Sequence, residues 1–277
     1  MKIKSVSHSG NLGDILYSLP ALHRAFYKDP MGLKFVYYIK LDRPSTFTDA
    51  QHPLGSVMMN RKMFDMAYPL LKAQPYIHEV IALEKGEDMR VDYDLDLFRK
   101  EYKNLSAGNI QTWISMVYPE LRPNLHRPSL FADPKPNDYI LVSRSSRYQN
   151  QWIDYSLLKH YDNVKFIGVE GEFKALRLHN PNIEHLEVKD FLELAELIAG
   201  CRLYIGNQSM PYAIAELLKV KRILEQFAHA PNVIPSGGEW YAFHTNEQFK
   251  KLLNKVLSSP HGKGENSNTT ETQTDKR

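Results

Sequence analysis

Residues 7–26 read SHSGNLGDILYSLPALHRAF, and this stretch decides the fold. A Gly-x-x-Gly turn from Gly10 to Gly13 runs directly into Asp14. The apolar residues that follow are spaced four, three and four positions apart: Ile15, Leu19, Leu22 and Phe26. This spacing predicts one buried face of a helix, and residues 3–9 before the turn have the composition of a strand. The stretch therefore predicts the strand–turn–helix start of an α/β domain.

Strand-like and helix-like segments alternate through the rest of the chain. The first half predicts strands at 33–39, 76–83 and 91–98, with a helical segment between the first two. The second half predicts strands at 139–143, 164–169, 202–206 and 222–227 and helices at 190–201, 209–220 and 246–257. Strands separated by helices indicate right-handed crossovers and mostly parallel sheets.

The proline-rich segment 129–137 predicts a linker between two domains, 1–128 and 138–257, because proline disfavours helix in its neighbours. Residues 258–277 contain no aromatic or aliphatic side chain, which predicts a disordered tail. The expected architecture is two doubly wound, Rossmann-like α/β domains that face each other across a cleft. A ligand is expected in that cleft, beyond the carboxyl ends of the strands.

Composition narrows the class of protein. The chain has 277 residues, 43% of them hydrophobic, and a formal net charge of +3, which fits a globular protein without a dense basic stripe. Nucleic acid is therefore a disfavoured partner. Cys201 is the single cysteine, so no intrachain disulfide is possible. No apolar run approaches the ~20 residues of a membrane span, so a cytoplasmic location is expected and a peripheral membrane contact stays open.

No metal is expected. Asp92, Asp94 and Asp96 imitate a D-x-D motif, but their period of two places them on one face of the strand predicted at 91–98. The eleven histidines include no pair at H-x-x-x-H spacing. We therefore expect neither a metal nor another cofactor.

Asp14 occupies the position at which a dinucleotide-binding loop would receive a phosphate. Only two of that fingerprint's three glycines are present, and a carboxylate in this place would repel a second anion by several kcal/mol. Two roles remain open. Asp14 either caps the helix, which the spacing alone favours, or serves as an ionised base that accepts a proton from a hydroxyl.

The second half offers a turn suited to an anion. Asn207, Gln208 and Ser209 lie where the strand at 202–206 gives way to a helix, and Pro211 falls in its first turn. Neutral hydrogen-bonding side chains at a helix start leave its N–H groups available to a phosphate. A simple cap by Ser209 explains the turn equally well.

The loops after two other strands supply further candidates. Ser143, Arg144 and Arg147 follow the strand at 139–143, and arginine binds phosphate oxygens in a forked geometry. Trp152 stacks on a planar ligand or belongs to the core. Glu170 accepts hydrogen bonds from ribose hydroxyls or is simply solvated together with Glu172. For each of these residues the structural explanation stays open beside the functional one.

The stretch GNLGDILYSLPAL resembles the opening of glycosyltransferase family 9, the lipopolysaccharide heptosyltransferase-like enzymes, which begin G-x-x-G-D-x-x-x-x-x-P-A-L. IGNQSMPYAIA, from residue 205, is similar to that family's donor-binding IGNDSGPMHLA. It departs at Gln208, Met210 and Ala213, where the family has Asp, Gly and His. These departures put the activity of the donor site in question.

The resemblance implies a GT-B architecture with Asp14 as the catalytic base. It implies an acceptor side and a donor side, each formed by residues named above. The acceptor side comprises Gly10, Asn11 and Gly13. The donor side comprises Ser143, Arg144, Arg147, Trp152, Glu170, Asn207, Gln208 and Ser209.

The expected activity is that of an inverting, metal-independent glycosyltransferase that uses a nucleotide-diphospho-sugar. Two alternatives stay open: a catalytically silent relative that binds a nucleotide sugar or glycan, and a nucleotide-sugar epimerase. The expected partners are a nucleotide sugar and a glycan or other hydroxyl acceptor. Lipopolysaccharide core, a protein, a small glycan and a modified nucleic-acid base all stay open as acceptors.

Overall fold

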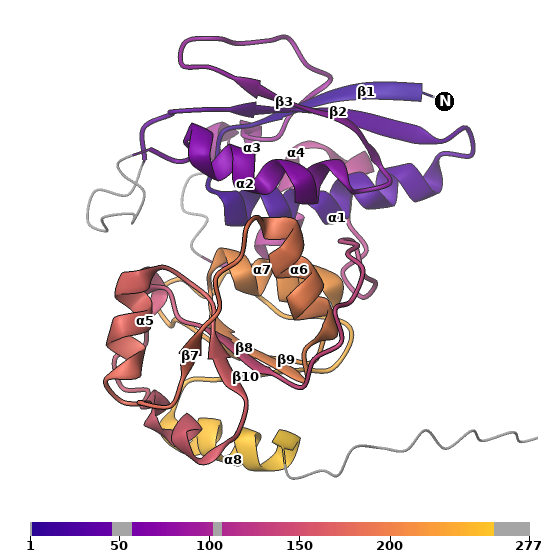
Figure 1. Cartoon of the computed structure of the whole chain (residues 1–277). Helices are drawn as coiled ribbons and strands as arrows, with labels where there is room; N and C mark the ends of the chain where they lie inside the picture. Colours follow the sequence, from indigo (N-terminus) through magenta and orange to yellow (C-terminus); the bar gives the residue numbers. More distant parts are fainter. Residues whose placement is uncertain (1, 46–56, 102–106, 258–277) are drawn as a thin grey trace, which may run out of the picture.

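The computed structural model describes residues 2–45, 57–101 and 107–257, so the predicted disordered tail at 258–277 lies outside the described residues. The described chain forms two α/β lobes, one above the other in Figure 1. Each lobe has its own sheet, and every strand pair in both sheets is parallel. The predicted α/β architecture with two parallel sheets is confirmed.

The N-terminal sheet has the strand order β3-β2-β1-β4. Its strands are β1 (Lys2–His8), β2 (Leu33–Lys40), β3 (Ile77–Leu83) and β4 (Tyr93–Asp94). The connecting helices α1 (Leu12–Lys28) and α2 (Arg61–Lys72) both lie on the face toward the other lobe (Figure 1). The connection from β3 to β4 contains no helix, so no helix from it covers the opposite face. The helices that connect β1, β2 and β3 thus lie between this sheet and the C-terminal lobe.

The strand predicted at 91–98 is only two residues long. The Asp94 carboxylate accepts a hydrogen bond from the backbone N–H of Asp96 at 3.1 Å, which turns the chain after β4. Such local side-chain bonds compete with the strand ladder. The turn leads into short helices at the β4 edge: α3 (Leu97–Glu101), η1 (Ile110–Thr112), α4 (Ile114–Val117) and η2 (Pro119–Leu121).

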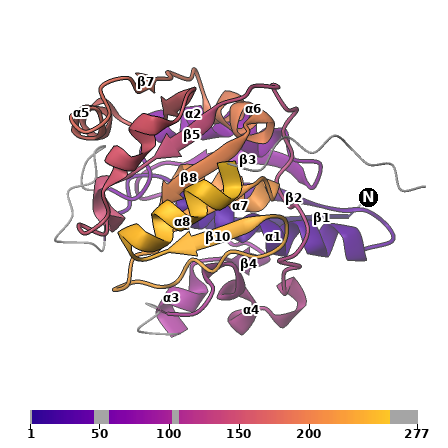
Figure 2. The same ribbon diagram turned by 90° about the horizontal axis from the view of Figure 1, so that it is seen from below.

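The C-terminal sheet has the order β10-β9-β8-β5-β6-β7. Its strands are β5 (Ile140–Ser143), β6 (Val164–Phe166), β7 (Glu184–His185), β8 (Leu203–Asn207), β9 (Arg222–Glu225) and β10 (Trp240–Phe243). Its helices are α5 (Glu170–Arg177), α6 (Phe191–Gly200), α7 (Met210–Leu218) and α8 (Asn246–Leu257), with short 3-10 turns η3 (Ser146–Tyr148) and η4 (Tyr155–His160). Helices α6 and α7 face the N-terminal lobe, whereas α8 lies on the opposite side of the sheet (Figures 1 and 2). The sequence patterns miss β10 and α5, which are both short.

The lobes meet helix against helix, with α1 packed on α7 and α2 packed on α6. One apolar core runs through this contact, because Leu19 of α1 and Ile214 of α7 belong to the same buried cluster. Two hydrogen bonds add to it: Ile110 donates its N–H to the Asn232 carbonyl at 2.8 Å, and Asn109 Nδ2 donates to the Ile234 carbonyl at 3.1 Å. Among the helices of the described residues, none has the length and apolar character needed to cross a bilayer.

Candidate functional site

A cavity of about 410 Å³ lies between the two lobes, and both contribute to its lining. The start of α1 and the segment around α3 and η1 form one wall. The start of α7, the η3 turn and residues 230–233 form the other. The segments that follow the carboxyl ends of β1, β5 and β8 thus line one cavity, as expected for ligand sites in parallel sheets.

Asp14 lines this cavity from the first turn of α1. The helix begins at Leu12, and its N-cap residue is Asn11, so Asp14 is the third helical residue rather than the N-cap. Its carboxylate accepts a hydrogen bond from Arg99 Nη2 at 2.8 Å and keeps 21% of its side-chain surface exposed. Asp14 is therefore an accessible anion at the mouth of the cavity.

Arg99 belongs to a charged cluster that the sequence patterns do not reveal. Its Nη1 donates to Asp96 Oδ1 at 2.9 Å, so the guanidinium bridges the buried Asp96 and the cavity-lining Asp14. Burial tends to raise the pKa of Asp96, but the neighbouring positive charge, that of Arg99 above all once His8 is neutral, outweighs it and holds that pKa below its usual value. Arg99 lies 85 positions from Asp14, and the one local signal for the cluster is the i,i+3 spacing of Asp96 and Arg99.

His8 supports the turn beneath this cluster. Its ring is buried, and burial lowers its pKa even though Asp96 opposes the shift from 3.3 Å. The neutral ring accepts a hydrogen bond at Nδ1 from the Gly10 N–H at 2.8 Å. The hydrogen bond to His8 thus holds the Gly-x-x-Gly turn in place, and Asn11 and Gly13 of this turn line the cavity.

The opposite wall presents the start of α7. Ser209 is its N-cap residue but makes no capping bond, and its hydroxyl donates instead to the Asn207 carbonyl at 3.2 Å. Pro211 falls in the first turn, as the sequence predicts. The first N–H groups of the helix therefore keep their capacity to bind an anion, and Ser209 and Met210 line the cavity in front of them.

Arg147 also lines the cavity, from the η3 turn. Its guanidinium lies 5.4 Å from the centre of the Tyr148 ring, and it forms no ion pair with any carboxylate that the structure describes. It is thus a partly exposed cation on the same wall as the α7 start. This arrangement provides one charged and several neutral donors for a diphosphate.

Asn207 and Gln208 position the loops of this wall. Asn207 is buried, accepts from the Ser145 N–H, and donates to the carbonyls of Ser145 and Tyr148. Gln208 lines the cavity, but its Nε2 donates to the Ala230 carbonyl at 2.7 Å and its Oε1 accepts from the Phe227 N–H at 2.8 Å. Both side chains are occupied by the protein. They therefore hold the lining in place rather than offer free groups to a ligand.

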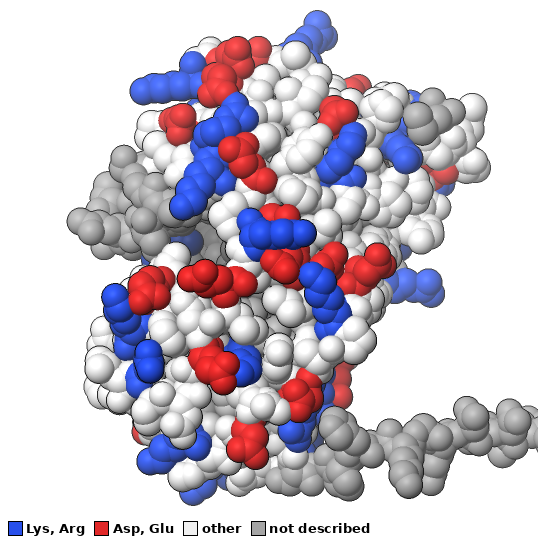
Figure 3. Space-filling view, viewed as in Figure 1, with Lys and Arg blue, Asp and Glu red and all other residues white. Residues whose placement is uncertain are grey.

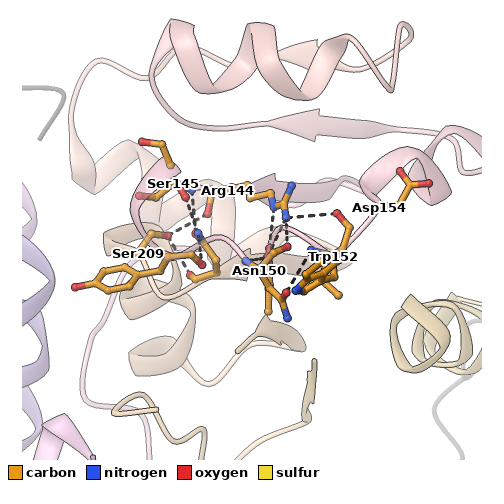
Figure 4. A network of polar contacts seen from close by, with 12 residues as sticks. Arg144, Ser145, Asn150, Trp152, Asp154 and Ser209 are labelled. Carbon is orange, nitrogen blue, oxygen red and sulfur yellow. Dashed lines mark hydrogen bonds and ion pairs between the residues drawn. The ribbon is translucent and has the colours of Figure 1, made fainter. Parts of the chain in front are cut away.

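Arg144 does not line the cavity. Its Nε and Nη2 donate to both carboxylate oxygens of the buried Glu225 at 2.9 and 3.0 Å, as the network in Figure 4 illustrates. Nη2 also donates to the Asn150 carbonyl. The expectation that Arg144 grips phosphate is corrected, because its charge is neutralised by a buried partner. Its role in the structure is to anchor the loop that carries Arg147.

Three other predicted donor residues also lie away from the cavity. Trp152 is 84% exposed and belongs neither to the core nor to the cavity lining. Glu170 is exposed and pairs with Lys174 and His185 at the start of α5. Ser143 is buried, and its hydroxyl bonds to Tyr204. Glu172 does not line the cavity either, but its carboxylate accepts from the Ser146 N–H at 2.9 Å in the η3 turn, and burial raises its pKa.

The aspartates of the D-x-D pattern have separate partners: Ser5 for Asp92, Lys100 for Asp94, and Arg99 with His8 for Asp96. Within residues 2–45, 57–101 and 107–257, no group of three His, Cys, Asp or Glu side chains is placed to hold a metal ion.

Gly10 and Gly13 give a matched test of this packing. A Cβ at Gly10 would lie 2.6 Å from His8 Cε1 and 2.9 Å from Arg99 Nη2, whereas a Cβ at Gly13 would meet no atom within 4 Å. We expect Gly10→Ala to lower the free energy of unfolding by about 1–3 kcal/mol through overpacking. Gly13→Ala should leave it unchanged or raise it by up to about 1 kcal/mol. Urea unfolding of both variants checks this, and equal effects would contradict the tight turn.

Comparisons with known proteins agree with this architecture. A glycosyl transferase of family 9 from Veillonella parvula superposes with a TM-score of 0.60 at 13% identity, covering 93% of this chain and 98% of that one. E. coli heptosyltransferase WaaC, solved with ADP, superposes with a TM-score of 0.64 at 12% identity, covering 92% of this chain and 100% of that one. E. coli ADP-heptose lps heptosyltransferase II superposes with a TM-score of 0.60 at 15% identity, covering 93% of this chain and 99% of that one. No family model and no curated protein matches the sequence. The chain therefore has the GT-B fold of these enzymes, and the predicted resemblance is confirmed at the level of the fold.

Proposed function

We propose that this protein is a glycosyltransferase that moves a sugar from a nucleotide-diphospho-sugar to an acceptor hydroxyl. One observation carries the proposal: Asp14 faces the start of α7 and Arg147 across a single cavity. A proton acceptor on one wall and a diphosphate cradle on the other are the two parts that such a transfer requires. The fold shared with heptosyltransferases, one of them solved with ADP, supports the same assignment.

The proposed step is a single displacement. The acceptor oxygen attacks the anomeric carbon from the Asp14 side, the bond from that carbon to the diphosphate breaks, and the hydroxyl proton passes to Asp14. Attack opposite the leaving group inverts the anomeric centre. The α7 N–H groups and Arg147 would stabilise the charge that develops on the departing diphosphate. No metal takes part in this scheme.

A screen for nucleotide release tests the proposal directly. The protein is incubated with UDP-, ADP-, GDP- and dTDP-sugars, with and without mixed hydroxyl acceptors, and free nucleoside diphosphate and product masses are followed. We expect one donor class to be consumed, in the presence of EDTA as well. Donor that is bound but never consumed would instead favour the silent relative. Met210 supports that second candidate, because it lines the cavity at the position where the family has glycine.

Arg147 should set the affinity for the leaving nucleotide. We expect Arg147→Gln to weaken binding of the preferred nucleoside diphosphate about 10- to 150-fold, since a charge-assisted contact to phosphate is worth about 1.5–3 kcal/mol. Calorimetric titration measures the change, which should shrink at high salt because the contact is electrostatic. The matched control is Arg177→Gln on α5, away from the cavity. Equal affinities of both variants would remove Arg147 from the donor site.

A further inference from the structure

The two walls of the interlobe cavity differ in chemistry. The C-terminal wall carries the polar side chains of Arg147, Gln208, Ser209 and Asn232. The N-terminal wall, beside Asn11, Asp14 and Arg99, is built mainly from thioethers, rings and aliphatic groups. Its apolar members include Met58, Met63, Phe98, Ile110 and Trp113. If the donor occupies the polar wall, the acceptor must bind against this apolar one.

Two rings and one guanidinium form a connected surface on the N-terminal wall. The Phe98 and Trp113 ring centres lie 5.7 Å apart with their planes tilted by 48°. The Arg99 guanidinium lies 4.6 Å from the centre of the Phe98 ring and also holds Asp14. An aromatic ring placed against this surface would gain edge and offset contacts, and its substituent would point toward the carboxylate.

Charge on this wall disfavours an anionic acceptor. Arg99 is the cation that the described residues contribute to it, and two carboxylates, Asp14 and Asp96, already neutralise that charge. On the face of the molecule shown in Figure 3, Lys and Arg side chains are interspersed with Asp and Glu, without an extended basic patch. A phosphorylated or carboxylated acceptor would therefore find little compensation for its desolvation.

A glycan fits this wall poorly as well. Sugar hydroxyls need hydrogen-bond partners around the ring. In the described N-terminal lining the side chains of Asn11, Asp14, Tyr17, Arg99 and Trp113 can provide them, whereas those of Leu12, Met58, Met63, Phe98 and Ile110 cannot. A buried hydroxyl without a partner costs about 1–3 kcal/mol. Small apolar rings with a single hydroxyl avoid that cost, and methionine sulfur packs favourably against their edges.

We propose, on the basis of the glycosyltransferase function above, that the acceptor is a small, uncharged aromatic compound. Its hydroxyl is attached to the ring directly or through one carbon. In the transfer, the bond from this oxygen to the anomeric carbon forms as the bond to the diphosphate breaks, and the proton goes to Asp14. The product is an aryl or arylmethyl glycoside together with a nucleoside diphosphate.

Pairs of acceptors that differ in one property test whether the acceptor is an uncharged aromatic compound. With the donor found in the release screen, benzyl alcohol should be used with kcat/KM at least tenfold higher than cyclohexylmethanol. Likewise, 4-hydroxybenzamide should be preferred at least tenfold over the anionic 4-hydroxybenzoate. Equal use of either pair, or a preference for methyl glycosides, would overturn the proposal. Hydrolysis of the donor in the absence of acceptor reports the transferase function separately, so the two ideas can fail independently.

Trp113 provides the matching variants. Trp113→Leu should raise the KM for benzyl alcohol at least tenfold and leave the donor Kd unchanged, whereas Trp113→Phe should recover most of the loss. The control is Trp240→Leu at the start of β10, outside the cavity. Urea unfolding verifies that the Trp113→Leu protein is folded. If no donor is consumed, saturation-transfer NMR still tests the proposal by measuring whether benzyl alcohol binds. The wild type should bind benzyl alcohol, and Trp113→Leu should not. A wild type that does not bind it would refute the proposal.

Discussion

Replacing Asp14 by asparagine should lower kcat for sugar transfer by about 10²–10⁴, the range that a positioned general base contributes. Asparagine keeps the size of the side chain and can still accept the hydrogen bond from Arg99, but it cannot take up the acceptor proton. Donor binding should be unchanged, because the donor cradle lies on the opposite wall of the cavity. Initial rates of nucleotide release and calorimetric titration of the donor measure the two effects separately.

The free energy of unfolding of Asp14→Asn shows whether its loss of activity comes from the lost base or from a less stable fold. Asp14 and Arg99 are both partly exposed, and Arg99 retains its bond to Asp96 at 2.9 Å when Asp14 is changed. We therefore expect the free energy of unfolding to change by no more than about 1 kcal/mol. Asp65→Asn on the exposed side of α2 is the matched control and should behave as the wild type in both assays. Transfer by Asp14→Asn at the wild-type rate would remove Asp14 from the mechanism.

Local sequence predicts the elements that depend on local chemistry. The hydrophobic spacing after Gly13 predicts α1, and Pro211 predicts the start of α7, because both signals act within one or two helical turns. Asp14 reaches the cavity for the same reason, since the turn that carries it is set by its neighbours in the chain. Whether it acts as the base stays a prediction.

The remaining features depend on partners far away in the sequence. Arg144 and Arg147 are three positions apart and equally basic, yet one meets the buried Glu225 and the other faces the cavity. No local pattern distinguishes them, because the difference comes from which strands lie side by side. Arg99 is missed for the same reason, and Trp152 is exposed although a tryptophan is usually buried.

The ion pair between Glu216 and Arg222 has the largest expected effect on stability. Both side chains are fully buried, with Arg222 Nε at 2.7 Å and Nη2 at 2.6 Å from Glu216 Oε2. Arg222 also donates to the carbonyls of Ser236 and Gly237, at 2.9 and 3.0 Å. The pair therefore ties α7 and β9 to the segment that precedes β10, and residues 232–233 of that connection line the cavity.

Arg222→Met should lower the free energy of unfolding by about 3–5 kcal/mol, because it breaks a buried ion pair and leaves the Glu216 carboxylate with Lys219, at 2.6 Å, as its remaining cation. Urea unfolding measures this loss. The control is Lys174→Met, which removes a pair with exposed partners on α5 and should cost less than about 1 kcal/mol. Adding Glu216→Gln to Arg222→Met should recover part of the loss, since it removes a buried carboxylate that has lost one of its two cations. A double variant that is as unstable as the sum of the two single variants would show that packing around Arg222, rather than its charge, holds this wall of the cavity.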